Sequence, residues 1–374
     1  MRHTLSQRAG WVGDQPIGRL IDRALAQPDL ISLAAGFVDQ MSLPVEATKS
    51  AALALFSHPE RARVALQYGP IAGDQGLRRQ ILDRVRAQDR ADPQAPRESD
   101  EPALQRVVLA AGSNQILYLL AQTLLDPGDI VLCEAPTYFV FTGIVRGCGA
   151  RTIGVACDEH GMDMSALEAQ LEQIASRGES SRVKAIYAMS YFDNPRSISL
   201  ARSRRARLVE LARRHSIYVI EDAAYRELRF GEEECASLLA HDEAGDTVAY
   251  AGTFSKSYAP GMRVGFAILP AALSDALLRM KVNLDFGAPH VNQHIVSEAL
   301  RLGLYDPHIA LLRSVYARKA ASMLRALDQH LGEPGLCRYT RPEGGLYVWL
   351  EVNSGIDTGP NGPLLDRALE QGVL

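Results

Sequence analysis

Short apolar runs alternate with amphipathic stretches through the middle of the chain. The apolar runs predict buried strands at 107–110, 130–133, 151–155, 183–189 and 217–220. The stretches between them predict helices ending near 125 and spanning 137–147, 163–176 and 200–215. This succession is typical of an α/β fold in which helices cover a mainly parallel sheet.

The flanking segments follow other patterns. Residues 1–28 predict an irregular arm with a helical stretch around 17–26, and a short apolar run at 30–36 ends in a glycine. The polar, proline-rich residues 89–105 predict an exposed connection. Helices are further predicted at 45–57, 74–88, 271–285, 290–304, 307–331 and 363–371, and a strand pair at 337–340 and 346–352.

Two apolar runs, 248–252 and 264–269, flank a polar loop and predict strands that carry it into a site. The loop contains Ser255, Lys256 and Arg263. Burial would favour the neutral amine of a lysine, which can attack a carbonyl and form a Schiff base. Serine and arginine are residue types that hold a phosphate. A surface lysine beside an ion-pairing arginine is the alternative interpretation.

Polar residues also follow several predicted strands, where ligands bind in parallel sheets. Ser113 and Asn114 lie at a strand-to-helix junction, which favours an anion but is equally explained by helix capping. Tyr138 can stack on a flat ring or pack in the core. Asn194 suits a turn, and Asp222 ends a buried strand, where its carboxylate needs a cationic partner. Either the protonated ring nitrogen of a ligand or a structural arginine would be a suitable partner for this carboxylate.

Composition narrows the function classes. The chain has 374 residues, 47% of them hydrophobic, which is enough for a large core and more than one domain-sized unit. A net charge of −4 gives no electrostatic case for binding nucleic acid or membranes. Five scattered cysteines without a CxxC pair predict reduced thiols and no metal site of cysteines. The polar N-terminus and the lack of a bilayer-length apolar run lead us to expect a soluble, cytoplasmic protein.

Taken together, these motifs resemble the fold-type-I pyridoxal-phosphate aminotransferases, in particular the 2-aminoadipate, kynurenine and aromatic aminotransferase branch. The most specific pieces are 221–226 (Glu-Asp-Ala-Ala-Tyr-Arg) and the segment from Thr253 to Phe266. The resemblance covers essentially the whole chain. It implies a three-layer α/β/α large domain with a mainly parallel sheet at 46–285, an N-terminal arm at 1–45 and a smaller α+β domain at 286–374.

The resemblance also implies roles for single residues. Lys256 would hold the pyridoxal 5'-phosphate aldehyde and shuttle a proton, while Asp222 would keep the pyridine nitrogen protonated. Asn194 and Tyr225 would bind the phenolic oxygen of the ring, and Tyr138 would stack on its face. The remaining assignments are phosphate contacts from Ser113, Asn114, Ser255 and Arg263, a contact of Tyr68 with the phosphate of a neighbouring subunit in a homodimer, and substrate contacts from Gly36 and Asn194.

Two departures from the family pattern affect these expectations. Arg196-Ser197 replaces the usual Thr-Gly after Asn194-Pro195, and we expect Arg196 to point to solvent. The chain ends at Leu374, where relatives continue with an arginine that grips the substrate α-carboxylate, so we expect an incomplete small domain. Arg19, in the arm, is the candidate replacement.

Three functions are consistent with the sequence. The first is an aminotransferase that moves an amino group between an L-amino acid and a 2-oxo acid such as 2-oxoglutarate, with broad or aromatic or aminoadipate-like preference. The second is a pyridoxal-phosphate enzyme of another class, such as a β-lyase or decarboxylase. The third is a catalytically impaired paralogue or the sensing half of a regulator. The first is the function that we predict; no metal is expected.

Overall fold

A seven-stranded sheet organises the structure, a computed structural model that describes residues 4–13, 18, 24, 26–27, 29–33, 36–94, 104–331, 336–353, 355–359 and 362–374. The sheet has the order β1-β9-β8-β7-β6-β2-β3. Its strands are β1 (Val107–Ala110), β2 (Ile130–Glu134), β3 (Arg151–Val155), β6 (Val183–Ala188), β7 (Tyr218–Asp222), β8 (Val248–Thr253) and β9 (Gly265–Ile268). Within this sheet β9 pairs antiparallel with both of its neighbours, β1 and β8, and the other described pairs are parallel. The predicted mainly parallel α/β sheet is therefore confirmed.

Side chains that alternate along the strands divide the core into two layers. Val131 belongs to one hydrophobic cluster and the adjacent Leu132 to the other, as the period of a strand requires. Helices α6 (Ser113–Leu124) and α7 (Phe139–Gly147) contribute to the first cluster, and α8 (Met164–Ser176) and α9 (Arg202–Arg214) to the second. Helices thus cover both faces, which leaves the strand ends free to form a site.

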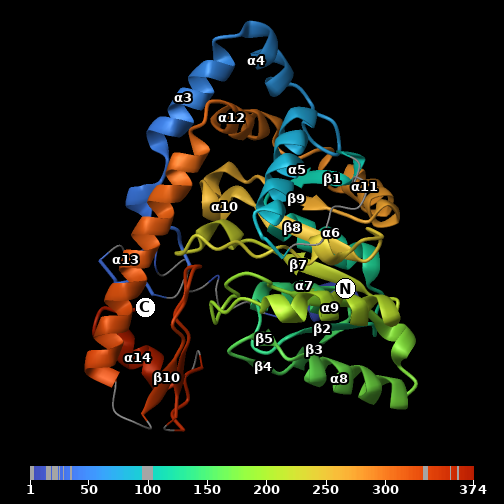
Figure 1. Ribbon diagram of the computed structural model, residues 1–374, viewed down its shortest axis with the longest axis vertical. Helices are drawn as coiled ribbons and strands as arrows, with labels where there is room; N and C mark the ends of the chain where they lie inside the picture. The colour runs from blue at the N-terminus through green and yellow to red at the C-terminus, as the bar shows by residue number, and fades with distance from the viewer. Residues whose placement is uncertain are drawn as a thin grey trace.

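The other elements surround this sheet (Figure 1). The long α13 runs the length of one side, α3 and α4 lie at the end that Figure 1 shows at the top, and β10 and α14 lie beside the opposite end of α13. The helices are α1 (Gln7–Trp11), α3 (Val45–Phe56), α4 (Pro59–Leu66), α5 (Gln75–Arg90), α10 (Phe254–Ser257), α11 (Ala271–Asp285), α12 (His290–Arg301), α13 (Tyr305–Leu331) and α14 (Pro363–Glu370), and the minor strands are β4 (Cys157–Asp158), β5 (Gly161–Met162), β10 (Cys337–Tyr339) and β11 (Leu350–Val352).

Short 3-10 turns complete the list of elements, and the segment around Ile31 pairs with the C-terminal residues. The turns are η1 (Gln40–Ser42), η2 (Leu104–Arg106), η3 (Ser180–Arg182), η4 (Arg226–Leu228), η5 (Leu239–His241) and η6 (Pro260–Met262). The amide of Ile31 donates to Gly372 at 2.9 Å, and the amide of Leu374 donates back to Ile31 at 3.0 Å. The predicted apolar run at 30–36 therefore pairs in part with the C-terminal residues.

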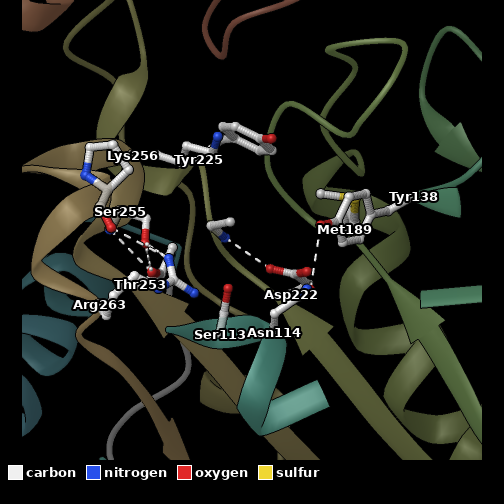
Figure 2. Close-up of a pocket in the computed structure, with 12 residues that line it drawn as sticks. Ser113, Asn114, Tyr138, Met189, Asp222, Tyr225, Thr253, Ser255, Lys256 and Arg263 are labelled. Carbon is white, nitrogen blue, oxygen red and sulfur yellow. Dashed lines mark hydrogen bonds between the residues drawn. The ribbon is translucent and has the colours of Figure 1, made fainter. Parts of the chain in front are cut away.

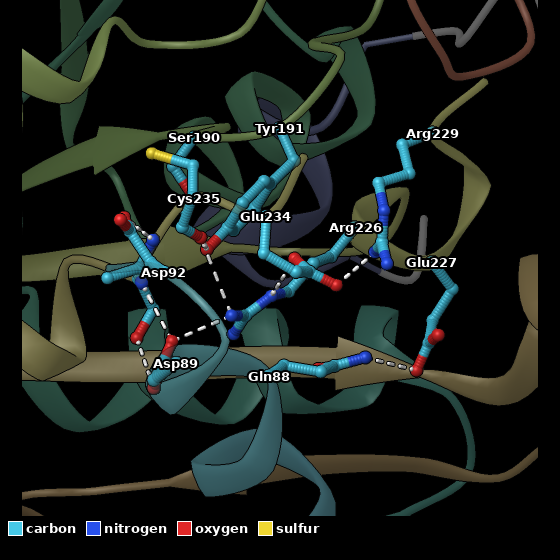
Figure 3. A network of polar contacts seen from close by, with 12 residues as sticks. Gln88, Asp89, Asp92, Ser190, Tyr191, Arg226, Glu227, Arg229, Glu234 and Cys235 are labelled. Atoms are coloured by element: carbon cyan, nitrogen blue, oxygen red, sulfur yellow. Dashed lines mark hydrogen bonds and ion pairs between the residues drawn. The ribbon is translucent and has the colours of Figure 1, made fainter. Parts of the chain in front are cut away.

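A buried polar network holds the segment after β7 against α5 (Figure 3). The Arg226 guanidinium donates to Asp89 Oδ1 at 2.7 Å, and Arg84 binds both carboxylate oxygens of Glu227 at 2.7 and 3.1 Å. Bidentate pairs of this kind fix orientation as well as distance. The network thereby restrains the segment that begins at Tyr225.

Among the described residues, no helix is both long enough and apolar enough to cross a membrane.

Candidate active site

A cavity opens at the carboxyl ends of β1, β6, β7 and β8, the edge where α/β sheets bind ligands (Figure 2). The side chains around it come from five separate stretches of the chain. They are Ser113, Asn114, Tyr138, Met189, Asp222, Ala224, Tyr225, Thr253, Ser255, Lys256, Pro260 and Arg263.

Lys256 reaches the cavity from α10, the short helix inside the predicted loop. Its Nζ donates to the carbonyl of Gly36 at 3.0 Å. Burial lowers the pKa of Lys256, and the nearby charge of Arg263 lowers it further. Both effects favour the neutral amine, which is the nucleophilic form.

Asp222 is the buried carboxylate of the site. It is 2% exposed, and its two oxygens accept hydrogen bonds from Tyr187 Oη at 2.8 Å and from the Ala224 amide at 3.1 Å. Burial raises the pKa of Asp222 to about 6, and the Tyr187 hydrogen bond works against that rise. A carboxylate held in this way gains most from a cationic partner inside the cavity.

Arg263, Ser255 and the start of α6 form the polar wall of the cavity; in Figure 2, Arg263 and Ser255 lie across from Asp222, and Ser113 lies between them. Arg263 donates through one nitrogen to Ser255 Oγ at 3.3 Å and through another to the Ala111 carbonyl at 3.0 Å. Ser113 and Asn114 begin α6, where the first amides of a helix attract an anion. The wall therefore combines a guanidinium, hydroxyls and a helix N-terminus, which together suit a phosphate.

Two glycines allow this wall to form. Gly112 has a φ of +84°, and a Cβ there would lie 2.5 Å from a guanidinium nitrogen of Arg263. A Cβ on Gly265 would lie 2.3 Å from the carbonyl carbon of Gly112 and 2.4 Å from the amide nitrogen of Ser113. Any larger residue at Gly265 would therefore displace the backbone that begins α6.

A chain of polar side chains joins Tyr225 to Asn194 through Tyr347, which was not predicted. The Tyr225 and Tyr347 hydroxyls lie 3.3 Å apart, and Asn194 Nδ2 donates to Tyr347 Oη at 3.2 Å. A Cβ on Gly36, whose φ is +59°, would come within 2.3 Å of Tyr347 Oη. The sequence signal was weak: Tyr347 follows Gly344-Gly345 at the start of a predicted strand.

Most of the predicted site residues meet at this cavity. Ser113, Asn114, Tyr138, Asp222, Tyr225, Ser255, Lys256 and Arg263 line it. The Gly36 carbonyl accepts a hydrogen bond from Lys256, and Asn194 donates one to Tyr347, so both residues are connected to the cavity through a neighbouring side chain. Tyr68 instead lies on the surface, 81% exposed, with its ring against Phe286. Arg19 lies outside the described residues.

The expectation that Arg196 points to solvent is wrong. Its side chain is 6% exposed and donates through Nε to Asp193 Oδ2 at 2.8 Å. Asp193 Oδ1 also accepts from the Ile198 amide at 2.9 Å, so the ion pair closes the loop that carries Asn194. The long side chain folds back onto a buried carboxylate only three residues away, which a sequence pattern does not reveal.

The cavity fits pyridoxal 5'-phosphate in the chemistry of its groups. It offers an amine with a lowered pKa for the aldehyde, a buried carboxylate for the ring nitrogen and a cationic, amide-rich wall for the phosphate. Tyr138, whose hydroxyl donates to Asn114 Oδ1 at 3.4 Å, supplies an aromatic face. These groups stand in one cavity, as a single flat, anionic aldehyde requires.

Comparison with known proteins supports this interpretation. The family model described as aminotransferase class I and II matches residues 28–361. A 2-aminoadipate transaminase of Thermus thermophilus is 34% identical over 93% of this chain and 80% of its own length. An aromatic-amino-acid aminotransferase of Thermococcus litoralis is 31% identical over 92% of this chain and 78% of its own.

A solved structure is also similar. The kynurenine aminotransferase of Pyrococcus horikoshii, in complex with PMP, superposes with a TM-score of 0.88 and 29% identity. The match covers 99% of this chain and 86% of that one.

Proposed function

Since the chain belongs to the aminotransferase class I and II family and is a pyridoxal-phosphate-dependent aminotransferase, we propose that it takes aromatic or 2-aminoadipate-like L-amino acids as donors and 2-oxoglutarate as acceptor. The relatives named above support this donor class, because two of them are named for 2-aminoadipate and aromatic amino acids. The single observation on which the chemistry rests is the buried amine of Lys256, whose pKa is lowered, in one cavity with Asp222 and Arg263.

Bound pyridoxal 5'-phosphate supplies an aldehyde that accepts the amino group and a ring that withdraws electrons from the substrate Cα. In our proposal, Ser113, Asn114, Ser255 and Arg263 bind the phosphate, and Tyr138 covers one face of the ring. Asp222 accepts a hydrogen bond from the protonated ring nitrogen. Its buried position, with Tyr187 on one oxygen, supports this role.

Lys256 then acts as the base for the substrate. Burial and the nearby charge of Arg263 lower the pKa of its Nζ, which would move a proton between the substrate Cα and the aldehyde carbon of the cofactor, in opposite directions in the two halves of the reaction. Tyr225 and Asn194 hold the phenolic oxygen of the ring, and Tyr347 orients both of them through its hydroxyl. Gly36, whose carbonyl reaches Lys256, and Asn194 lie on the side from which we expect the substrate to approach.

We further propose that the protein is a homodimer that works in the cytoplasm. Large apolar side chains are exposed over α3, α4 and the turn that follows, an arrangement that marks an interaction surface. They include Val45 (68%), Leu53 (61%), Val64 (56%), Leu66 (69%) and Tyr68 (81%), and the exposed Phe286 (63%), at the end of α11, lies against Tyr68. In this dimer Tyr68 would reach the phosphate of the partner's cofactor.

A substrate panel tests the donor and acceptor. Purified protein with added cofactor should convert tyrosine, kynurenine or 2-aminoadipate with 2-oxoglutarate at a higher kcat/KM than alanine or aspartate. Equal rates with every donor would contradict the proposed class. Sedimentation of the wild type and of a Leu53→Glu, Val64→Glu variant tests the dimer, which should dissociate in the variant.

A further inference from the structure

A second group of polar side chains lies outside the cavity, where α12 meets the start of α5. His290 and His294 are one helical turn apart on α12 and therefore share a face. Asp74 is the N-cap of α5, and its Oδ1 accepts from the Leu77 amide at 2.7 Å. The second carboxylate oxygen of Asp74 faces the two imidazoles.

The distances within this group suit a shared cation. The two Nε2 atoms lie 3.2 Å apart, and His294 Nε2 lies 3.9 Å from Asp74 Oδ2. One ligand atom from each of the three residues lies within 4.8 Å of the others. Zinc–nitrogen bonds of about 2.0–2.1 Å place two tetrahedral nitrogen ligands about 3.3–3.4 Å apart. The imidazoles are thus already at the separation that one ion would impose.

The tautomer of His290 is fixed by its other ring nitrogen. Nδ1 lies 3.1 Å from the Val64 carbonyl and 3.3 Å from the Gln67 carbonyl. Carbonyl oxygens only accept, so Nδ1 carries the proton and Nε2 presents a lone pair toward His294. Metal-binding histidines are typically held in this way, with the second nitrogen donating to a backbone carbonyl.

The surroundings leave the group accessible and rigid. The side chains of His294 and Asp74 are 15% and 20% exposed, so an ion can enter from solvent. On the buried side, the ring of His290 packs on Gly69, where a Cβ would lie 2.6 Å away. Arg61, the neighbouring cation, is paired with Glu298.

We propose that Asp74, His290 and His294 bind one divalent transition-metal ion, best matched by Zn²⁺, which ties α12 to the turn that carries Tyr68. Two imidazoles and one carboxylate are ligands that zinc accepts, with a fourth position for water. The ion would fasten Tyr68, Gly69 and the N-cap of α5 to one helix face. This proposal does not depend on the substrate of the enzyme.

A simple hydrogen bond between the histidines is the competing explanation. In that case His294 Nε2 donates to His290 Nε2, and Asp74 contributes only helix capping. The variant His294→Gln separates the two, because an amide still donates a hydrogen bond but is a poor zinc ligand. Asp74→Asn likewise retains capping and removes the charged ligand.

The experiment is a metal titration of the cofactor-loaded enzyme after treatment with a chelator. Equilibrium dialysis with Zn²⁺, and Co²⁺ difference spectra as an optical probe, should give one ion per chain. We expect binding to weaken at least tenfold in Asp74→Asn and to vanish in His294→Gln, and to remain unchanged in the control His330→Ala, an exposed histidine elsewhere on α13. Zn²⁺ should raise the unfolding temperature of the wild type but not that of His294→Gln.

Other results would overturn the proposal. These are the absence of saturable binding in the wild type, or equal binding in the wild type and His294→Gln. An unfolding temperature of the wild type that Zn²⁺ leaves unchanged would refute the claim that the ion ties α12 to the turn. Because ion binding is measured directly, none of these results depends on whether the enzyme transaminates the proposed donors.

Discussion

The buried pair of Arg196 and Asp193 offers a sharp test of how this structure differs from the family pattern. Arg196→Met removes the charge while keeping much of the side-chain volume. The Asp193 carboxylate, 1% exposed, then loses the guanidinium that contacts its Oδ2 and keeps backbone hydrogen bonds, among them the one from the Ile198 amide to Oδ1. The variant thus leaves a buried carboxylate without its cationic partner.

The expected loss follows from this geometry. Removing one partner of a buried pair typically destabilises a protein by about 3–5 kcal/mol. Because the Ile198 hydrogen bond remains, we expect the free energy of unfolding to fall by about 3 kcal/mol, at the lower end of that range. The double variant Asp193→Asn, Arg196→Met removes both charges, so we expect a loss of only about 1 kcal/mol.

The loss should also depend on pH. Burial raises the pKa of Asp193, and Arg196 opposes that rise. Without Arg196 the pKa rises further, so folded Arg196→Met binds a proton more tightly than the unfolded chain does. A raised carboxyl pKa stabilises the folded state at low pH and less as pH increases. The penalty of the single variant should therefore be largest near neutral pH and shrink in acid.

Urea unfolding followed by circular dichroism, on protein freed of cofactor, measures these differences. Arg318→Met is the matched control, because Arg318 is exposed and donates to the exposed Ser314 one turn away on α13. It should change stability by less than about 0.5 kcal/mol. If the single variant proves as stable as the double variant, or its penalty does not change with pH, the pair does not act as described.

Three further predictions concern the cavity. Asp222→Asn should lower kcat/KM at least about a hundredfold, since a neutral amide does not stabilise a protonated ring nitrogen. Steady-state kinetics measures this loss, with Tyr218→Phe, a substitution outside the cavity, as the control. Gly265→Ala should weaken cofactor binding at least about tenfold, because its Cβ meets backbone at 2.3 Å. The control Gly261→Ala, with no heavy atom within 4 Å of its Cβ, should leave the affinity unchanged in a fluorescence titration. Equal affinities of the two variants would contradict the close approach at Gly265. Tyr347→Phe should lower kcat about tenfold, because Tyr225 and Asn194 lose their hydrogen bonds to it, with little change in the unfolding temperature. An unaltered kcat would contradict a role of Tyr347 in orienting these two side chains.

Local patterns were sufficient to predict the sheet and the residues at its strand ends. An apolar run at 217–220 leads into Asp222, and the loop with Lys256 lies between two further apolar runs, so both could be located from periodicity. Parallel strands bring their carboxyl ends to one edge, and this is why residues far apart in sequence meet there. The specific roles came from the resemblance to a family.

What could not be predicted depends on long-range packing. Tyr347 reaches Tyr225 from 122 residues away, and no local signal marks that contact. Arg196 turns inward because Asp193 is buried beside it, which depends on the tertiary fold. The Asp74–His290–His294 group likewise joins two helices that are distant in sequence. Tyr68 lies away from the cavity of its own chain, so its role remains a prediction about a dimer.

The most direct test of the account is an absorption spectrum of the protein with pyridoxal 5'-phosphate, recorded before and after addition of an amino donor. We predict a visible cofactor band that depends on Lys256, is absent in Lys256→Ala and is lost when tyrosine or 2-aminoadipate donates its amino group. Adding 2-oxoglutarate should restore the band. A band that ignores every donor, or one that persists unchanged in Lys256→Ala, would contradict the assignment of Lys256 as the residue that carries the chemistry.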